Sequence, residues 1–170
     1  MRSWESLIRA SNRELEQVLR DGMRPDPGAL VGREYDGYNR PWFTRLIGIQ
    51  KFVKGFDRDE HGAAYGYNRS DRHPRSGPDR AWDPKPRRFG FYDLIPASEH
   101  PRCRRYTNAI VLDYGTGRNP WYDPSARIRD YLVCVEGHDL LLGKAYIDIG
   151  LIRLFSNFFV LRARSTGAEM

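Results

Sequence analysis

After Gly28, short β-branched and aromatic runs alternate with clusters of Gly, Pro, Asn and Asp, and this pattern constrains the fold most strongly. Regularly spaced runs of this kind are typical of an all-β sandwich or barrel. Most connections are shorter than the crossover of about a dozen residues that a parallel pair requires, so neighbouring strands should be antiparallel. We predict strands near residues 30–38, 46–56, 62–68, 87–95, 107–115, 127–136, 139–149 and 151–162.

The last three strands give the clearest signals. A hairpin turn is predicted at Glu136–Asp139, and Gly150 marks the next reversal. Eight antiparallel strands favour a closed or nearly closed barrel, which either fills its interior or holds one small ligand. We therefore predict a mainly β fold: a roughly eight-stranded antiparallel barrel over residues 29–163, within a single domain of residues 1–170.

An amphipathic helix is predicted over residues 3–22, before the barrel. Ser3 can cap its start, and Gly22 followed by Pro25 and Pro27 should end it. The stripe must dock on another element, and the barrel is the expected target. Its members follow helical spacing: Trp4, Leu7, Ile8, Ser11, Leu15, Val18 and Leu19.

The positive charge is concentrated in one part of the chain. The net charge is +6, and residues 69–105 hold ten basic against five acidic residues. Residues 69–86 are rich in proline and arginine and are predicted to form a long surface loop. A nucleic-acid binder would be more uniformly basic, so this class is disfavoured, although the loop mixes arginines (Arg75, Arg80, Arg87, Arg88) with aromatic residues that could stack on bases.

The sequence indicates a cytoplasmic protein. It has no apolar run of about 18 residues and hence no expected membrane-spanning helix, and its start lacks the apolar region of a secretory signal. Cys103 and Cys134 match no zinc spacing and are expected to be reduced. Three neighbouring arginines would lower the pKa of Cys103 if it were exposed, but a solvated, unreactive loop cysteine is the favoured interpretation.

The strand around residue 144 carries the first candidate site. Lys144, Tyr146 and Asp148 alternate with apolar residues and should project to one face. This face is either solvated or, in a ligand-holding barrel, lines the interior. In the second case these three residues are candidate catalytic groups, and Lys144 and Tyr146 are candidate ligand contacts.

Further candidates come from lysines and aromatic residues in strands. The chain has four lysines, Lys51, Lys54, Lys85 and Lys144, and three of them fall in predicted strands, where a compact ammonium could be required. A short repeat, Tyr35–Arg40 and Tyr65–Arg69, forms either ordinary turns or one rim of the barrel. The complete set of predicted ligand contacts is Tyr35, Tyr38, Lys51, Tyr67, Phe91, Asp113, Lys144 and Tyr146.

Two aspartates follow apolar runs. Asp93 and Asp113 are either turn caps or buried carboxyl groups that could act as general bases with raised pKa values. The four histidines show no metal-binding spacing, so neither a metal nor a cofactor is expected.

The segment Gly32-Arg33-Glu34-Tyr35-Asp36-Gly37 and the barrel layout resemble the calycin superfamily, which includes the lipocalins. Lipocalins begin their first strand with Gly-x-Trp and end with an arginine that packs on that tryptophan. Here Tyr35 lies three positions after Gly32, the helix precedes the barrel instead of following it, and Arg153 or Arg162 would be the late arginine. The resemblance implies binding of a small apolar ligand.

Three functions are therefore considered. The leading one is a binding module that holds a small, mostly apolar molecule in the barrel. The second is an enzyme on the same scaffold, with acid–base or cyclisation chemistry on a small hydrophobic substrate. The third is an interaction or nucleic-acid module that uses the arginine-rich loop.

Overall fold

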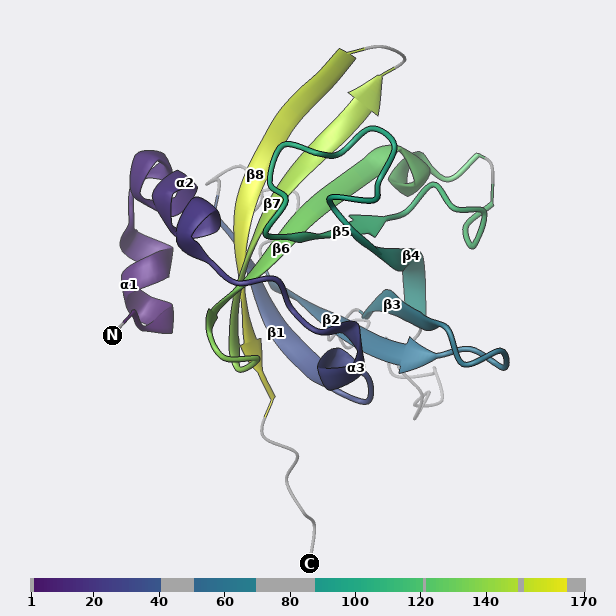
Figure 1. Cartoon of the computed structure of the whole chain (residues 1–170), viewed down its shortest axis with the longest axis horizontal. Helices are drawn as coiled ribbons and strands as arrows, with labels where there is room; N and C mark the ends of the chain where they lie inside the picture. Colours follow the sequence, from purple (N-terminus) through teal and green to yellow (C-terminus); the bar gives the residue numbers. More distant parts are fainter. Residues whose placement is uncertain (1, 41–50, 70–87, 121, 150–151, 165–170) are drawn as a thin grey trace, which may run out of the picture.

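The computed structural model describes residues 2–40, 51–69, 88–120, 122–149 and 152–164. Its eight strands form a closed antiparallel barrel in which each strand pairs with its neighbours in the chain and β1 pairs with β8 (Figure 1). The strands are β1 (Glu34–Asn39), β2 (Lys51–Arg58), β3 (Ala64–Arg69), β4 (Arg88–Pro96), β5 (Ile110–Asp113), β6 (Ile128–Glu136), β7 (Leu140–Ile149) and β8 (Ile152–Ala163).

The predicted eight-stranded antiparallel barrel is confirmed, and so is the turn between β6 and β7. The first strand was predicted to begin at residue 30, but a short helix, α3 (Pro27–Leu30), occupies that place and β1 begins at Glu34. Asp26 caps α3 by accepting a hydrogen bond from the backbone of Gly28. Residues 46–50 of the second predicted strand, most of the basic loop 69–86 and Gly150 lie outside the described residues.

One cluster of buried apolar side chains fills the inner face of the barrel, and it draws on seven of the eight strands. Leu30 of α3 belongs to this cluster, and the Tyr35 hydroxyl donates a hydrogen bond to the carbonyl of His138 at 2.8 Å. Together they close one end of the barrel, which we call the α3 end; the opposite end is the far end. The cluster consists of Leu30, Tyr35, Phe56, Tyr92, Ile110, Leu112, Tyr114, Leu132, Cys134, Leu141, Ala145, Phe159 and Leu161.

Aromatic rings lie directly against glycines inside the barrel. A Cβ atom on Gly66 would lie 2.0 Å from the Tyr92 ring, and one on Gly143 would lie 2.0 Å from the Phe159 ring. Real Cβ contacts are never this short, so only glycine permits these rings to lie across the neighbouring strand. The inner wall thus depends on large and small residues paired across strands.

The predicted N-terminal helix is divided into two helices. α1 (Trp4–Arg9) ends at Ala10, whose backbone is extended, and α2 (Asn12–Asp21) begins at once. The break occurs because Ser11 is an N-cap instead of a helical residue: it forms a capping box with Glu14. Ser3 caps α1 and Gly22 ends α2, as predicted.

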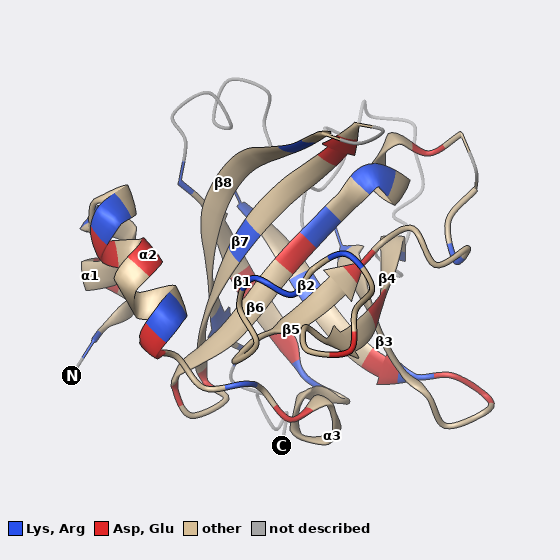
Figure 2. Ribbon diagram, turned by 45° about the horizontal axis from the view of Figure 1, so that its top comes forward, with Lys and Arg blue, Asp and Glu red and all other residues tan. Residues whose placement is uncertain are grey.

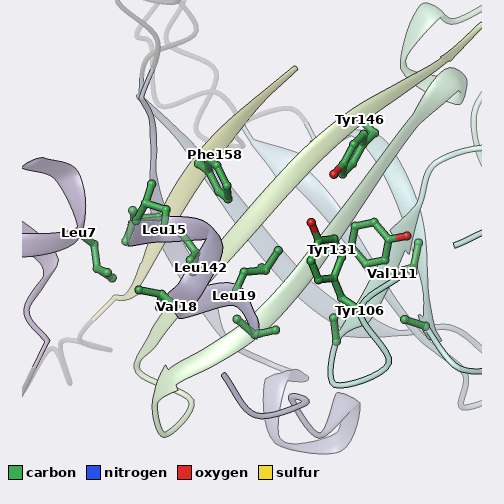
Figure 3. Close-up of a cluster of buried hydrophobic side chains, with 14 of the residues drawn as sticks. Leu7, Leu15, Val18, Leu19, Tyr106, Val111, Tyr131, Leu142, Tyr146 and Phe158 are labelled. Atoms are coloured by element: carbon green, nitrogen blue, oxygen red, sulfur yellow. The ribbon is translucent and has the colours of Figure 1, made fainter. Parts of the chain in front are cut away.

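Both helices lie against the outside of the barrel (Figure 1), over β6, β7 and β8. Leu15, Val18 and Leu19 of α2 are buried in a second apolar cluster with outward-facing residues of these strands, such as Leu142 and Phe158 (Figure 3). The sheet is therefore covered on both faces here. For this reason several charged residues of β6 and β7 (Figure 2), such as Asp130 and Lys144, are buried although they interrupt apolar strands.

Replacement of Leu19 by alanine tests this docking. The Leu19 side chain is fully buried between α2 and the barrel, so Leu19→Ala should lower the free energy of unfolding by about 2–5 kcal/mol. Arg13→Ala, at an exposed position of the same helix, should change it by less than about 0.5 kcal/mol. Urea denaturation followed by circular dichroism measures both; equal effects of the two changes would contradict the docking.

Candidate functional site

A lysine and an aspartate form a buried ion pair inside the barrel. Lys54 lies on the inner face of β2 together with Phe56, and Asp130 lies on the inner face of β6 together with Leu132. The Lys54 Nζ atom is 3.3 Å from the Asp130 Oδ2 atom, and the two side chains are only 3% and 4% exposed. Charged side chains are rarely this buried unless they are paired, and removing two charges from water has a large desolvation cost even for a pair. The position of this pair inside the barrel therefore requires an explanation.

Two polar residues complete the group around Lys54. The ammonium donates hydrogen bonds to Asn68 Oδ1 at 3.2 Å and to the Tyr114 hydroxyl, and Tyr114 in turn donates to Asp130 Oδ2 at 3.2 Å. Asn68 is held by a hydrogen bond from its side-chain nitrogen to the carbonyl of Gly90, at 3.0 Å. Gly90 has a φ of 54° at a register shift between β3 and β4, a conformation that favours glycine.

Aromatic rings enclose the lysine head group. The Nζ atom lies 4.6 Å from the centroid of the Tyr92 ring, 5.1 Å from Tyr114, 5.3 Å from Phe159 and 5.7 Å from Phe52. Cations are attracted to ring faces within about 6 Å, and more strongly where water is excluded. The rings and Asp130 together offset the cost of burying the charge.

Burial changes the acidity of both partners. Desolvation lowers the pKa of Lys54, and the neighbouring Asp130 opposes this change. Desolvation likewise raises the pKa of Asp130, and Lys54 and Tyr114 oppose it. Burial also raises the pKa of Tyr114 well above its usual value, so this hydroxyl keeps its proton and remains a donor to Asp130.

One atom of the group has no hydrogen-bond partner among the described residues. The Asp130 Oδ1 atom is buried and accepts no hydrogen bond from any residue that the structure describes. An unpaired buried carboxylate oxygen costs about 1–3 kcal/mol or more, so such atoms in folded proteins usually bind water or a ligand. We therefore take Lys54, Asp130, Tyr114 and Asn68 as the candidate site and call them the interior polar group.

Lys144, Tyr146 and Asp148 do project to one face of β7, as predicted. This face is the outer face of the barrel, and all three side chains are nevertheless buried. Lys144 Nζ donates to Glu16 Oε2 of α2 at 2.6 Å and to the Tyr106 hydroxyl at 2.8 Å. The face is therefore neither solvated nor directed into the barrel, because α2 and the loop after β4 (residues 97–109) cover it. Asp148 accepts two hydrogen bonds from Arg153, at 2.6 and 3.0 Å.

Most of the other predicted ligand contacts also lie on the outer face. Among them only Tyr35 belongs to the inner cluster, at the α3 end. The Tyr67 hydroxyl donates to Glu34 at 3.0 Å, and Phe91 lies beside Tyr65 with ring centroids 6.2 Å apart. Tyr38 and Lys51 face each other across β1 and β2, on the outer side by strand alternation, and Lys51 is exposed.

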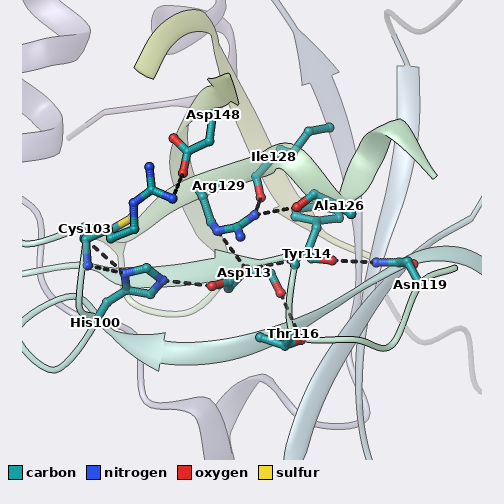
Figure 4. Close-up of polar contacts among 12 residues, drawn as sticks. His100, Cys103, Asp113, Tyr114, Thr116, Asn119, Ala126, Ile128, Arg129 and Asp148 are labelled. Carbon is teal, nitrogen blue, oxygen red and sulfur yellow. Dashed lines mark hydrogen bonds and ion pairs between the residues drawn. The ribbon is translucent and has the colours of Figure 1, made fainter. Parts of the chain in front are cut away.

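Asp113 belongs to a separate cluster on the outer wall (Figure 4). Its Oδ2 atom lies 2.8 Å from His100 Nε2, and its Oδ1 atom 2.8 Å from Arg129 Nε. His100 Nδ1 accepts hydrogen bonds from the backbone N–H groups of Arg102 and Cys103, so its Nε2 carries the proton that Asp113 accepts. The carboxylate is thus occupied as an acceptor and fixes the loop after β4 instead of serving as an available base.

Three further expectations are corrected or refined here. Cys103 was expected to be a solvated loop residue, but it is fully buried, and burial raises the pKa of its thiol instead of lowering it. Asp93, the other candidate base, is bound by Arg118. Of the two candidate late arginines, Arg162 does pack on a tryptophan, 5.0 Å from the ring of Trp4, but this tryptophan belongs to α1 and not to the first strand.

The sequence contained a signal for the interior polar group. Lys54 was among the strand lysines considered, and Asp130 interrupts an apolar strand in phase with Leu132 and Cys134. Asp93 and Asp113 follow apolar runs, the pattern expected of a buried strand-end carboxylate, whereas Asp130 precedes such a run. Asn68 and Tyr114 could not be assigned, because their contact with Lys54 depends on strand register.

Comparisons with protein-family models, with curated proteins and with solved structures each find no match. The resemblance to calycins is therefore supported only by the presence of an eight-stranded antiparallel barrel. Within the described residues, no helix has the length and apolar character needed to cross a membrane, and no three His, Cys, Asp or Glu residues are grouped to hold a metal ion.

The buried pair predicts opposite results for single and double replacements. Lys54→Met leaves the carboxylate of Asp130 buried without a counterion and should cost about 3–5 kcal/mol of unfolding free energy. The double variant Lys54→Met/Asp130→Leu removes both charges and should be much closer to the parent. Urea denaturation at pH 7 measures both, with exposed Lys51→Met as control. A double variant no more stable than the single one would refute the pairing.

The same single variant should depend on pH in a defined direction. Without Lys54 the pKa of Asp130 rises further above its unfolded value of about 4. A carboxyl group whose pKa is raised by folding binds more protons in the folded state than in the unfolded state. The free energy of unfolding therefore falls as the pH rises from the unfolded pKa toward the folded pKa. The deficit of Lys54→Met relative to the parent should therefore be small near pH 4 and large at pH 7. Denaturation curves at both pH values test this, and a constant deficit would contradict it.

Proposed function

We propose that the barrel binds a small, mostly apolar molecule in its interior and that the interior polar group orients it. The observation that carries this proposal is the Asp130 Oδ1 atom, which has no partner among the described residues and lies in a mostly apolar and aromatic wall. Asn157, a buried polar side chain of the same wall outside the interior polar group, is already bound to Asn39. An apolar enclosure with a few convergent polar groups is the usual composition of a small-molecule site. The resemblance to calycins points to the same class of ligand.

The far end of the barrel is the proposed route of entry. Leu30 and the Tyr35–His138 hydrogen bond occupy the α3 end, whereas Asn68, Tyr114 and Asp130 all lie near the strand ends on the opposite side. Four residues of the β7–β8 hairpin continue the inward-facing positions beyond Ala145 and are exposed: Ile147, Ile149, Ile152 and Leu154. They provide an apolar approach to the interior.

Acid–base catalysis on a molecule in the same interior is a second candidate. One observation favours it: a lysine whose pKa is lowered by burial lies beside a carboxyl whose pKa is raised, with a tyrosine hydroxyl between them. Groups with shifted pKa values of this kind are common in active sites. On this alternative Lys54, Tyr114 and Asp130 replace Lys144, Tyr146 and Asp148 as the candidate catalytic residues.

The nucleic-acid alternative rests on residues outside the described ranges, since Arg75, Arg80 and Arg87 belong to residues 70–87. Arg88 is described, and it is engaged by Asp57 at 3.0 Å and by the Tyr67 ring, whose centroid lies 3.9 Å from its guanidinium carbon. The described part of the basic segment therefore offers this alternative little support. A cytoplasmic location remains part of our proposal, in keeping with two free, buried cysteines.

A tryptophan placed beside Asp130 tests the binding proposal. Ala145 lies on the inner face directly opposite Asp130, so the indole of Ala145→Trp would occupy the space beside the interior polar group. Binding of N-phenyl-1-naphthylamine, followed by its fluorescence, should weaken at least about tenfold, which corresponds to about 1.4 kcal/mol. Ser98→Trp, on an exposed turn, is the matched control and should bind like the parent.

Two outcomes would contradict the proposed binding in the barrel interior. A parent protein that does not bind the probe, or an Ala145→Trp variant that binds it as the parent does, would refute interior binding. Circular dichroism and urea denaturation establish that both tryptophan variants are folded before affinities are compared, because added volume in a packed interior commonly costs about 1–3 kcal/mol.

A further inference from the structure

We infer that the molecule bound inside the barrel is a neutral alcohol or phenol, whose hydroxyl group donates a hydrogen bond to Asp130 Oδ1. This inference rests on the proposed function and specifies its ligand class. It follows from the hydrogen-bonding inventory of the interior polar group, from its charge balance and from the side chains around it.

The inventory leaves an acceptor and no donor. An ammonium has three N–H groups, and those of Lys54 are directed to Asn68, Tyr114 and Asp130 Oδ2. The Tyr114 hydroxyl donates its one proton to Asp130 Oδ2, and the nearby Tyr92 hydroxyl donates to backbone carbonyls. Asp130 Oδ1 is the atom of the group without a partner among the described residues. A ligand must therefore bring a donor.

The charge balance selects a neutral donor. The charges of Lys54 and Asp130 cancel, and both side chains are almost completely removed from water. A ligand ammonium would add a second cation there and a ligand carboxylate a second anion, each with a desolvation cost of several kcal/mol. An ether or a ketone is neutral but accepts hydrogen bonds only, so it would leave Asp130 Oδ1 unpaired. A hydroxyl group satisfies both conditions.

The surroundings select an apolar body for this hydroxyl. The methyl side chain of Ala145 lies across from Asp130, and the rings of Phe52, Tyr92 and Phe159 surround the lysine head group. Beyond them the inner wall is apolar as far as the α3 end. The remainder of the ligand is thus expected to be hydrocarbon, either aromatic or aliphatic.

Pairs of isomers test the effect of the hydroxyl group at constant composition and nearly constant size. 1-Heptanol and 1-methoxyhexane have the same composition, as do 4-ethylphenol and 4-methylanisole, and only the first member of each pair can donate. Hydrogen bonds to charged groups contribute about 1.5–3 kcal/mol, so the donor should bind at least about tenfold more tightly than its ether isomer. Competition with N-phenyl-1-naphthylamine measures both affinities, and Ala145→Trp should weaken both members of a pair.

The double variant Lys54→Met/Asp130→Leu is the control for the contact itself. It has no carboxylate at position 130 and leaves only neutral acceptors such as the freed Asn68 Oδ1, so the preference for the alcohol over the ether of each pair should be smaller than in the parent. A preference for the alcohol as large as that of the parent would overturn the assignment to Asp130.

The parent protein gives a result that does not depend on how any variant folds. Equal binding of the isomers to the parent would overturn the inference about the hydroxyl but leave interior binding standing. Failure of the parent to bind the isomers and the naphthylamine probe alike would refute the proposed function, and the inference with it.

Discussion

The pairing of β1 with β8 is the constraint on which the rest of this structure depends. It closes the sheet, and closure gives every strand an inner and an outer face that remain distinct along its length. Two apolar clusters follow from this division, one inside the barrel and one between the barrel and the N-terminal helices. Without closure, Lys54 and Asp130 would lie on an open sheet in contact with water, and their pairing would contribute little.

Closure also gives the two buried lysines different roles. Lys144 and Lys54 are similarly buried, and each contacts a carboxylate and a tyrosine hydroxyl. The carboxylate at Lys144 comes from α2, so this pair joins a helix to the barrel wall. The carboxylate at Lys54 comes from another strand of the same barrel, and one of its oxygens has no hydrogen-bond partner among the residues that the structure describes. The first arrangement explains how α2 docks on the barrel, and the second is the basis of the proposed ligand binding.

Much of the fold could be predicted from the sequence, because strand length, alternation and turn residues are local signals. The β6–β7 hairpin and the long β8 strand are examples. The break in the N-terminal helix was missed because Ser11 fits helical spacing as well as capping, and only its contact with Glu14 distinguishes the two. The choice of face was harder still. Alternation correctly grouped Lys144 with Tyr146 and Asp148, but it does not say which face is inside. The N-terminal helix was expected to dock on the barrel, but the strands that it covers could not be predicted.

The position of the N-terminal helices has a consequence for how this protein folds during its synthesis. α2 packs on β6 and β7, α1 on β8, and β1 also pairs with β8, which ends at Ala163. β1 pairs with β2 as well, but its other edge and the apolar faces of α1 and α2 pack on strands that lie between Ile128 and Ala163. Until these strands have been synthesised, the apolar stripe of α2 and one edge of β1 remain uncovered, a state in which growing chains are prone to aggregate. The barrel can therefore close, and its N-terminal helices can dock, only after β8 has been synthesised.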